Sequence, residues 1–383
     1  MSVSAGLAVA NTYYSQPILK EIADTVAVPV NKVGYIPALS IAGYGVGLFI
    51  ITPLGDSSNR KKLLLRVQLL LVMLLLTMAT AQTYWQIGML SFLIGCFSIT
   101  AQLLIPMAAV LDKASRAKTV SIIVTGLLIG MLSARIFSGY ISTVFNWRCV
   151  YGFSAVLVLC STLLLHLLLP NSAKSYTGNY IELLRSTAGL AARLPLLRIH
   201  ALLGALIFAT LCAFWTTLTL HLSGTPWHYS PATIGSFSIT GVAGALATLV
   251  IGKYITAYNS TRARIAAVGC IITGIVLPVV FPYAITALIV SIVLLDVGVQ
   301  ATQLTNLATI YTLYEQAPSR VNTVYMTISF AGGALGTIIA LYCWKYGGWL
   351  LVLGLLSALS ITAIFVAWHL HVRAHRVTTV AAV

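Results

Sequence analysis

Apolar stretches of about 20 residues recur from one end of this chain to the other. Leu63–Ala81 and Val150–Leu169 are two that contain few polar residues. An α-helix of about 20 apolar residues is long enough to cross the roughly 30 Å hydrocarbon core of a bilayer. Because lipid cannot hydrogen-bond to the backbone, a crossing segment of this kind must satisfy its own polar groups as a helix. The sequence therefore predicts an all-α membrane protein.

Counting stretches of this length predicts twelve transmembrane helices. They are expected near 3–19, 33–54, 63–82, 85–111, 119–144, 149–169, 199–222, 231–257, 264–282, 284–313, 323–345 and 348–370. The third and sixth are almost uniformly apolar and suit contact with lipid. The fourth, seventh and tenth contain polar residues, which need a polar neighbour or a wet cavity.

The charge distribution supports the membrane assignment and gives an orientation. Of the 383 residues, 59% are hydrophobic and 8% are charged, whereas soluble domains carry about 25% charged residues. The net charge of +15 comes from cations spread over short connections, so a nucleic-acid-binding patch is not indicated. Most Lys and Arg lie in alternate connections, such as 60–66 and 113–118, which predicts cytoplasmic N- and C-termini.

A polar, basic segment at the midpoint divides the chain. We expect an N-terminal six-helix bundle over 1–169, a cytoplasmic linker over 170–198, and a C-terminal six-helix bundle over 199–383 that ends in a short cytoplasmic tail. Ser40-Ile41-Ala42-Gly43 in the first half is echoed by Ser238-Ile239-Thr240-Gly241 in the second. Such echoes predict a duplication that produced two pseudo-symmetric bundles, a common construction of transporters.

Several short motifs carry a resemblance to a known family. They are Asn11-x-Tyr13-Tyr14-x-Gln16-Pro17, Pro53-Leu54-Gly55-Asp56 with the following Arg60-Lys61-Lys62, Asn146-Trp147-Arg148, Leu295-Asp296-x-Gly298-Val299-Gln300 and Arg320-x-Asn322-Thr323-Val324-Tyr325-Met326. On these residues the chain resembles the major facilitator superfamily, in particular a bacterial branch of proton-coupled efflux proteins. The resemblance implies secondary active transport by alternating access.

The leading functional hypothesis is proton-coupled efflux of a small organic solute from the cytoplasm of a bacterial cell. Two alternatives remain open: a solute-uptake symporter, and a degenerate remnant that does not transport, which Ser57 and Ser58 favour because the family usually has Arg after Asp56. The expected partners are a small-molecule solute, the proton and the lipid bilayer. We expect a monomeric, multi-pass protein of the bacterial inner membrane that does not bind nucleic acid.

An enzymatic function is not predicted. The helices offer no nucleophile–base pair or metal-ligand cluster at membrane depth, and Gly252-Lys253 lacks the other residues of a nucleotide-binding loop. The six cysteines contain no Cys-x-x-Cys pair and suit small packing residues. We therefore expect no cofactor, no metal site and no catalytic residue.

Two ionisable residues are predicted to lie deep inside helices, Arg135 in the fifth and Asp296 in the tenth. Insertion scales put the cost of each at about 2.5–3.5 kcal/mol at the bilayer centre, so each needs a partner, water or a function. Asp296 is interpreted as the acid that couples protons or solute to transport, or as a structural carboxyl. Arg135 is interpreted as an anion-receiving or Asp296-pairing group, or as a structural cation that bonds a carbonyl.

Polar residues share a face with Asp296. Gln300, Gln303 and Asn306 fall within about a third of the helix circumference around it. They can line a solute pathway or bond one helix to another. In the resembled family the first, fourth, seventh and tenth helices surround the central cavity, which adds further candidate lining residues. These are Asn11, Tyr14, Gln16, Gln102, Trp215 and Thr217.

A further motif lies at the predicted cytoplasmic end of the second helix. In the resembled family, Gly55, Asp56, Arg60, Lys61 and Lys62 correspond to a cytoplasmic latch between the two halves. The alternative is an ordinary basic loop, which accounts for the cations but not for Asp56.

Overall fold

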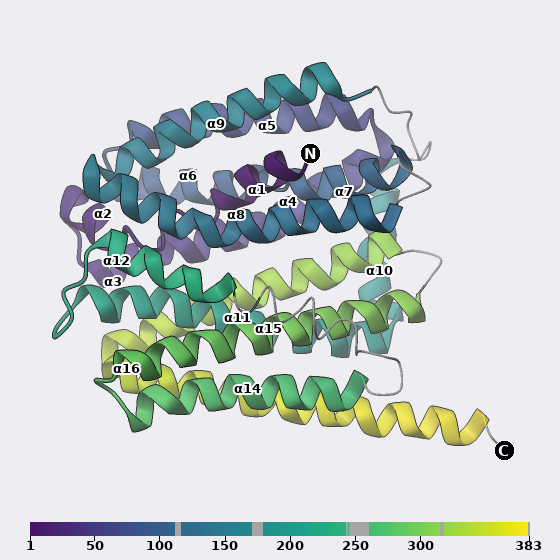
Figure 1. Ribbon diagram of the computed structural model, residues 1–383. Helices are drawn as coiled ribbons and strands as arrows, with labels where there is room; N and C mark the ends of the chain where they lie inside the picture. Colours follow the sequence, from purple (N-terminus) through teal and green to yellow (C-terminus); the bar gives the residue numbers. More distant parts are fainter. Residues whose placement is uncertain (112–115, 171–178, 243, 245–259, 315–317, 382–383) are drawn as a thin grey trace. The chain divides into compact units, whose positions relative to one another are not determined.

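A computed structural model describes residues 1–383 apart from 112–115, 171–178, 243, 245–259, 315–317 and 382–383. The described residues are almost entirely helical (Figure 1). The helices are α1 Ser2–Ala10, α2 Leu19–Val26, α3 Val30–Val33, α4 Tyr35–Ser57, α5 Arg60–Ala79, α6 Tyr84–Phe97, α7 Thr100–Leu111, α8 Arg116–Val144, α9 Trp147–Leu168, α10 Tyr180–Arg193, α11 Pro195–Ser223, α12 Pro231–Ser236, η1 Phe237–Thr240, α14 Ser260–Val280, α15 Ile285–Leu313 and α16 Pro318–Ala381.

The predicted all-α membrane architecture is confirmed. Within the described residues, nine helices are long and apolar enough to cross a bilayer. The longest of these, α16, covers both of the last two predicted segments and bends at Gly348, whose φ of 60° and ψ of −153° are not helical. Part of the predicted 231–257 segment lies outside the described residues, and the count of twelve stays a prediction.

The chain forms two compact units. The first contains Met1–Ser186 together with Leu218–Ile239, and the second contains Thr187–Thr217 together with Thr240–Val383. The long helix α11 therefore begins in the second unit and ends in the first. The expected division at 1–169, 170–198 and 199–383 stays a prediction.

Small residues let helices of the first unit approach closely. α1 packs on α8, and α4 packs on α6. A methyl group added to Gly6 would lie 2.5 Å from the carbonyl oxygen of Gly126, so the two backbones are in direct contact there. Gly43 and Gly47 of α4 make similar backbone contacts with α6, at Phe92 and Cys96. These glycines allow close packing of the helices, because the absence of a side chain lets the backbones touch.

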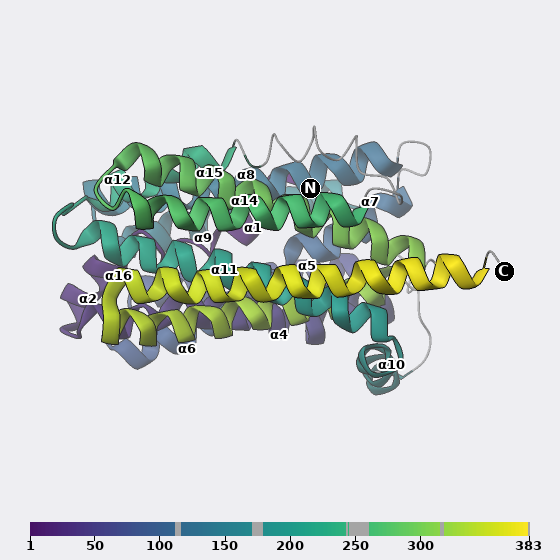
Figure 2. The same ribbon diagram turned by 90° about the horizontal axis from the view of Figure 1, so that it is seen from below.

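The second unit repeats this device. Gly332 and Gly336 of α16 face Ala205 and Ala209 of α11, and a methyl group on Gly332 would lie 2.5 Å from the Ala205 carbonyl oxygen. α14 packs on both α15 and α16, and Figure 2 shows it running beside the C-terminal part of α16. Glycine pairs of the same spacing, Gly126 with Gly130 and Gly332 with Gly336, thus support corresponding helix contacts in the two halves.

The first predicted helix is shorter than expected. A continuous helix over 3–19 was predicted, but α1 ends at Ala10 and a series of turns leads to α2. The Asn11 side chain donates to the carbonyls of Leu7 and Ala8 at 2.9 and 3.1 Å. Asn11 thus satisfies the last carbonyls of α1 itself, and Pro17 lacks the N–H that a continuing helix would need at that position.

The segment predicted as a linker contains a helix of its own. α10 spans Tyr180–Arg193 and is drawn nearly end-on in Figure 2, where α11 runs along the page. Leu190 and Ala191 of α10 pack on a buried cluster that includes Leu197 and Ala201. The polarity of the segment predicted an exposed connection but did not indicate this apolar face.

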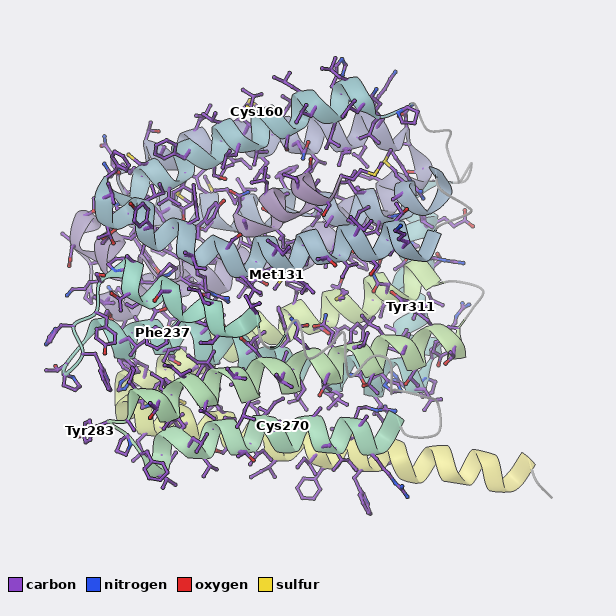
Figure 3. All side chains as sticks on the ribbon, viewed as in Figure 1. Met131, Cys160, Phe237, Cys270, Tyr283 and Tyr311 are labelled. Carbon is purple, nitrogen blue, oxygen red and sulfur yellow. The ribbon has the colours of Figure 1, made fainter. Side chains whose placement is uncertain are left out.

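Large apolar side chains cover much of the outer surface. Leu167 and Leu168 of α9 are 76% and 78% exposed, a surface suited to lipid chains. Exposed aromatic residues lie at helix ends. Trp85 stands at the start of α6, and Tyr283 lies in the turn between α14 and α15, where Figure 3 labels it. Exposed aromatic residues at the ends of membrane-spanning helices are typical of the membrane–water interface.

Candidate functional site

Asp296 is buried within the second unit. Its side chain on α15 is 9% exposed, and its Oδ1 accepts a hydrogen bond from Trp215 Nε1 of α11 at 3.4 Å. The backbone of Gly244 also comes close, since a methyl group on that glycine would lie 3.0 Å from Asp296 Cβ. The sequence indicated Asp296 and Trp215 as separate candidates, and the structure brings the two side chains together.

Two of the other three polar residues on the Asp296 face contact neighbouring helices. Gln303 Nε2 lies 3.7 Å from Met326 Sδ of α16. Asn306 is fully buried, and its Nδ2 donates to the Tyr325 hydroxyl at 3.4 Å. Gln300 is partly buried. The contacts of Gln303 and Asn306 join α15 to α16, and a role of this face in lining a solute pathway stays a prediction.

A buried polar cluster in the second unit was not predicted. His200 Nδ1 of α11 lies 3.2 Å from Asn306 Oδ1 and 3.4 Å from a terminal nitrogen of Arg264 on α14. His200 and Arg264 are only 2% and 3% exposed. With Tyr325, the cluster joins four helices. The sequence placed His200 and Arg264 at the ends of apolar segments, where basic residues usually face water, so position alone gave no signal of their burial.

Arg135 is buried within the first unit. Its guanidinium donates through Nε to Gln16 Oε1 at 2.6 Å and lies over the Tyr13 ring, 5.1 Å from the centroid. Both Arg135 and Gln16 are buried, at 6% and 1% exposure. Bonds to polar and aromatic neighbours offset part of the cost of placing a cation in this helix. The contact with Gln16 was not predicted, although both residues were singled out.

Asn11 and Tyr14 fix the turns that carry Gln16. Asn11 Oδ1 accepts from Ser154 Oγ of α9 at 2.7 Å. The Tyr14 ring packs edge-on against Tyr151, with centroids 6.4 Å apart, and lies 5.7 Å from Phe137. These contacts surround both candidates with protein, so the residues 11–16 are held firmly against α8 and α9.

The remaining candidates contact residues of their own helix or of a neighbouring part of the same unit. Gln102 bonds to the Tyr44 side chain of α4, and Thr217 donates to the Ala213 carbonyl of its own helix at 2.7 Å. Arg60 Nε donates to the Gly55 carbonyl at 2.9 Å, and Lys61 Nζ donates to the carbonyl of Leu169, the residue that follows α9. Lys62 is exposed, and the Asp56 side chain lies outside the described residues. The role of the latch residues between the two halves stays a prediction.

Metal binding has no support among the residues that the structure describes, where His, Cys, Asp and Glu form no group of three or more. The polar sites instead consist of amides, hydroxyls, one buried carboxyl and buried cations. Groups of this kind donate and accept hydrogen bonds.

Comparison with known proteins identifies the family of this chain. The family model described as Major Facilitator Superfamily matches residues 1–337. The chain belongs to the major facilitator superfamily. It is 33% identical over 353 residues to the uncharacterized transporter YgaY of Escherichia coli O157:H7. The matched region covers 91% of this chain and 89% of YgaY.

Solved structures of superfamily members have the same fold. The human organic anion transporter MFSD10 gives a TM-score of 0.71 at 15% identity, covering 96% of this chain and 98% of that one. The nucleoside transporter NupG gives a TM-score of 0.76 at 13% identity, covering 96% of this chain and 99% of that one.

Membership of the superfamily confirms the broad prediction. The protein is a multi-pass membrane transporter and not an enzyme. Members of the superfamily carry small solutes across membranes. The motifs on which the sequence resemblance rested therefore identified the family correctly.

Proposed function

We propose that this transporter exports a small organic solute across a bacterial inner membrane in exchange for protons. It works as a monomer by alternating access, with both termini in the cytoplasm. Asp296 is the coupling acid, and the polar residues around it and around Arg135 line the solute pathway. The dense Lys and Arg content of alternate connections supports the orientation.

The burial of Asp296 carries the coupling proposal. The carboxyl group lies on a transmembrane helix at 9% exposure, next to the Trp215 indole. An ionised carboxyl is costly in an apolar setting and is favoured by water or a nearby cation. A carboxyl whose surroundings alternate between these two settings takes up a proton in one state and releases it in the other. Alternating access supplies that change of surroundings.

The similarity to other transporters supports only a broad solute class. MFSD10 is named as an organic anion transporter and NupG as a nucleoside transporter. Both names describe small organic molecules, which agrees with the amide and aromatic groups around the candidate residues. At 15% and 13% identity the choice of solute does not carry over from these proteins.

An accumulation assay tests the proposal. The protein is expressed in cells that lack their major export pumps, and a panel of fluorescent organic cations, organic anions and sugars is followed with and without a proton uncoupler. Wild type is expected to lower accumulation of at least one solute until the uncoupler is added. Asp296→Asn is expected to abolish this export at equal membrane expression.

Asp24→Asn provides a matched control because it makes the same chemical change at an exposed carboxyl outside the spanning helices. The control is expected to export like wild type. Uncoupler-sensitive uptake would support the symporter alternative instead. Unchanged accumulation of every solute at good membrane expression would favour the non-transporting remnant, and normal export by Asp296→Asn would remove this residue from the coupling step.

A further inference from the structure

The turns after α1 contain buried polar groups that the fold does not satisfy. Gln16 is 1% exposed, and its Nε2 has no hydrogen-bond partner in the part of the chain that the structure describes. The hydroxyls of Thr12 and Ser15, in the same turns, are also buried and without such a partner. A buried polar group is normally satisfied by protein or water, so three in five residues need an explanation.

These groups share one chemical property. The Gln16 Nε2 amide is purely a donor, and the two hydroxyls can each donate a hydrogen bond. Arg135, whose guanidinium bonds to the other end of the same amide at 2.6 Å, adds a positive charge and further donors. The Gln16 amide therefore presents its unsatisfied N–H groups immediately beside a buried cation. An acceptor with negative charge fits this arrangement, whereas a cation would be repelled by it.

The surrounding contacts make the arrangement rigid. Asn11 is bonded to Leu7, Ala8 and Ser154, and the Tyr14 ring is packed against Phe137 and Tyr151. The segment cannot readily turn the Gln16 amide away to find another partner. Donors held in place before a ligand arrives lose little freedom when it binds.

The depth of the group suits a transported solute. Arg135 lies nine residues before the end of α8 at Val144, which corresponds to roughly 14 Å along the helix axis. It is thus well inside the span and not at a headgroup surface. We propose that Arg135 and Gln16 bind the carboxylate of the transported solute, so that the solute is an organic acid.

In this arrangement the carboxylate accepts from Gln16 Nε2 and from the Arg135 guanidinium, while Gln16 Oε1 keeps its bond to Arg135 Nε. The Tyr13 ring below the guanidinium, 5.1 Å from it, holds the plane of the cation. The identification of the bound acid as the transported solute rests on the proposed function. Binding of the acid itself requires only the first unit.

Matched acid–amide pairs test the binding site directly. The purified full-length protein is heated in detergent at constant ionic strength with acetate or acetamide, benzoate or benzamide, and nicotinate or nicotinamide. At least one acid is expected to raise the midpoint of unfolding with increasing concentration, while its amide does not, because a ligand that binds only the folded state stabilises it. If every acid behaves like its amide at millimolar concentration, the proposal is overturned.

Substitutions locate the effect. Gln16→Glu places a permanent carboxylate beside Arg135 and is expected to weaken acid binding at least tenfold without unfolding the protein. Arg135→Gln is expected to do the same. Thr162→Ala deletes a buried hydroxyl of the first unit that bonds to Gln68 and not to residues 11–16, and this control is expected to bind the acid like wild type. Acid binding by Gln16→Glu with wild-type affinity would contradict the proposal.

Asp296→Asn separates this inference from the coupling proposal. Its carboxyl lies in the second unit, so the variant is expected to bind the acid normally although it does not drive export. Loss of export with intact acid binding, the expected result, would show that Asp296→Asn is impaired in coupling and not in acid binding. Intact proton-driven export together with indistinguishable binding of acids and amides would indicate failure of the acid site alone.

Discussion

The contact between α11 and α16 offers a quantitative test of the packing in the second unit. A methyl group on Gly336 would lie 2.5 Å from Ala209 Cβ and 2.7 Å from Ala209 Cα. Carbon atoms normally approach to about 3.5–4.0 Å, so Gly336→Ala requires the two helices to separate by about 1 Å. Overpacking of this kind costs typically 1–3 kcal/mol, and the better helix propensity of alanine returns roughly 0.5–1 kcal/mol.

The expected net result is a loss of about 1 kcal/mol, and at most about 2.5 kcal/mol, in the free energy of unfolding. Gly354→Ala is the matched control, because it lies on the same helix with no atom within 4 Å of the added methyl group. The control is expected to be as stable as wild type or slightly more so. Both free energies are measured by denaturant titration of the purified protein in the same detergent. Equal stability of the two variants would refute the close contact between α11 and α16.

Two further predictions concern the helix termini. Gly348→Ala forces a residue with a side chain into the conformation at φ 60° and ψ −153°, which is essentially restricted to glycine and costs other residues on the order of 1–3 kcal/mol. The same titration should show this loss, and wild-type stability would argue against the bend. Burial raises the pKa of Glu21, and the nearby Asp24 carboxylate raises it further. Folding is therefore opposed by ionisation of Glu21, and stability falls as pH rises towards and through the folded-state pKa. Glu21→Gln should accordingly be more stable than wild type at neutral pH and lose this advantage in acid. Thermal unfolding at several pH values measures the difference. A stability advantage that does not change with pH would contradict the raised pKa of Glu21.

Much of the fold could be predicted because hydropathy reports on membrane depth. The apolar stretches located most of the long helices, whereas the contact of Gly6 with Gly126 joins two distant parts of the sequence and appears only in the structure. Hydropathy does not report where a helix ends inside the membrane. The end of α1 at Ala10 depends on the bonds of Asn11 with its own helix and with Ser154, which require a neighbour that the local sequence does not reveal.

The candidate site was predicted in part for the same reason. Asp296 and Arg135 were recognisable because ionisable residues are rare within apolar segments. Their partners Trp215 and Gln16 come from distant parts of the sequence, and only the packing of helices joins them. His200 and Arg264 were missed because they lie at segment ends, where a basic residue normally indicates the aqueous boundary.

Transport by the purified protein in proteoliposomes tests the central claim, that Asp296 couples proton movement to solute movement. A solute found in the accumulation assay is offered under two conditions: equal pH with solute exchange across the membrane, and an imposed pH gradient that drives uphill movement. Asp296→Asn is expected to retain exchange, which needs no net proton transfer, and to lose uphill transport. Uphill transport by Asp296→Asn at the wild-type rate would contradict the proposed mechanism.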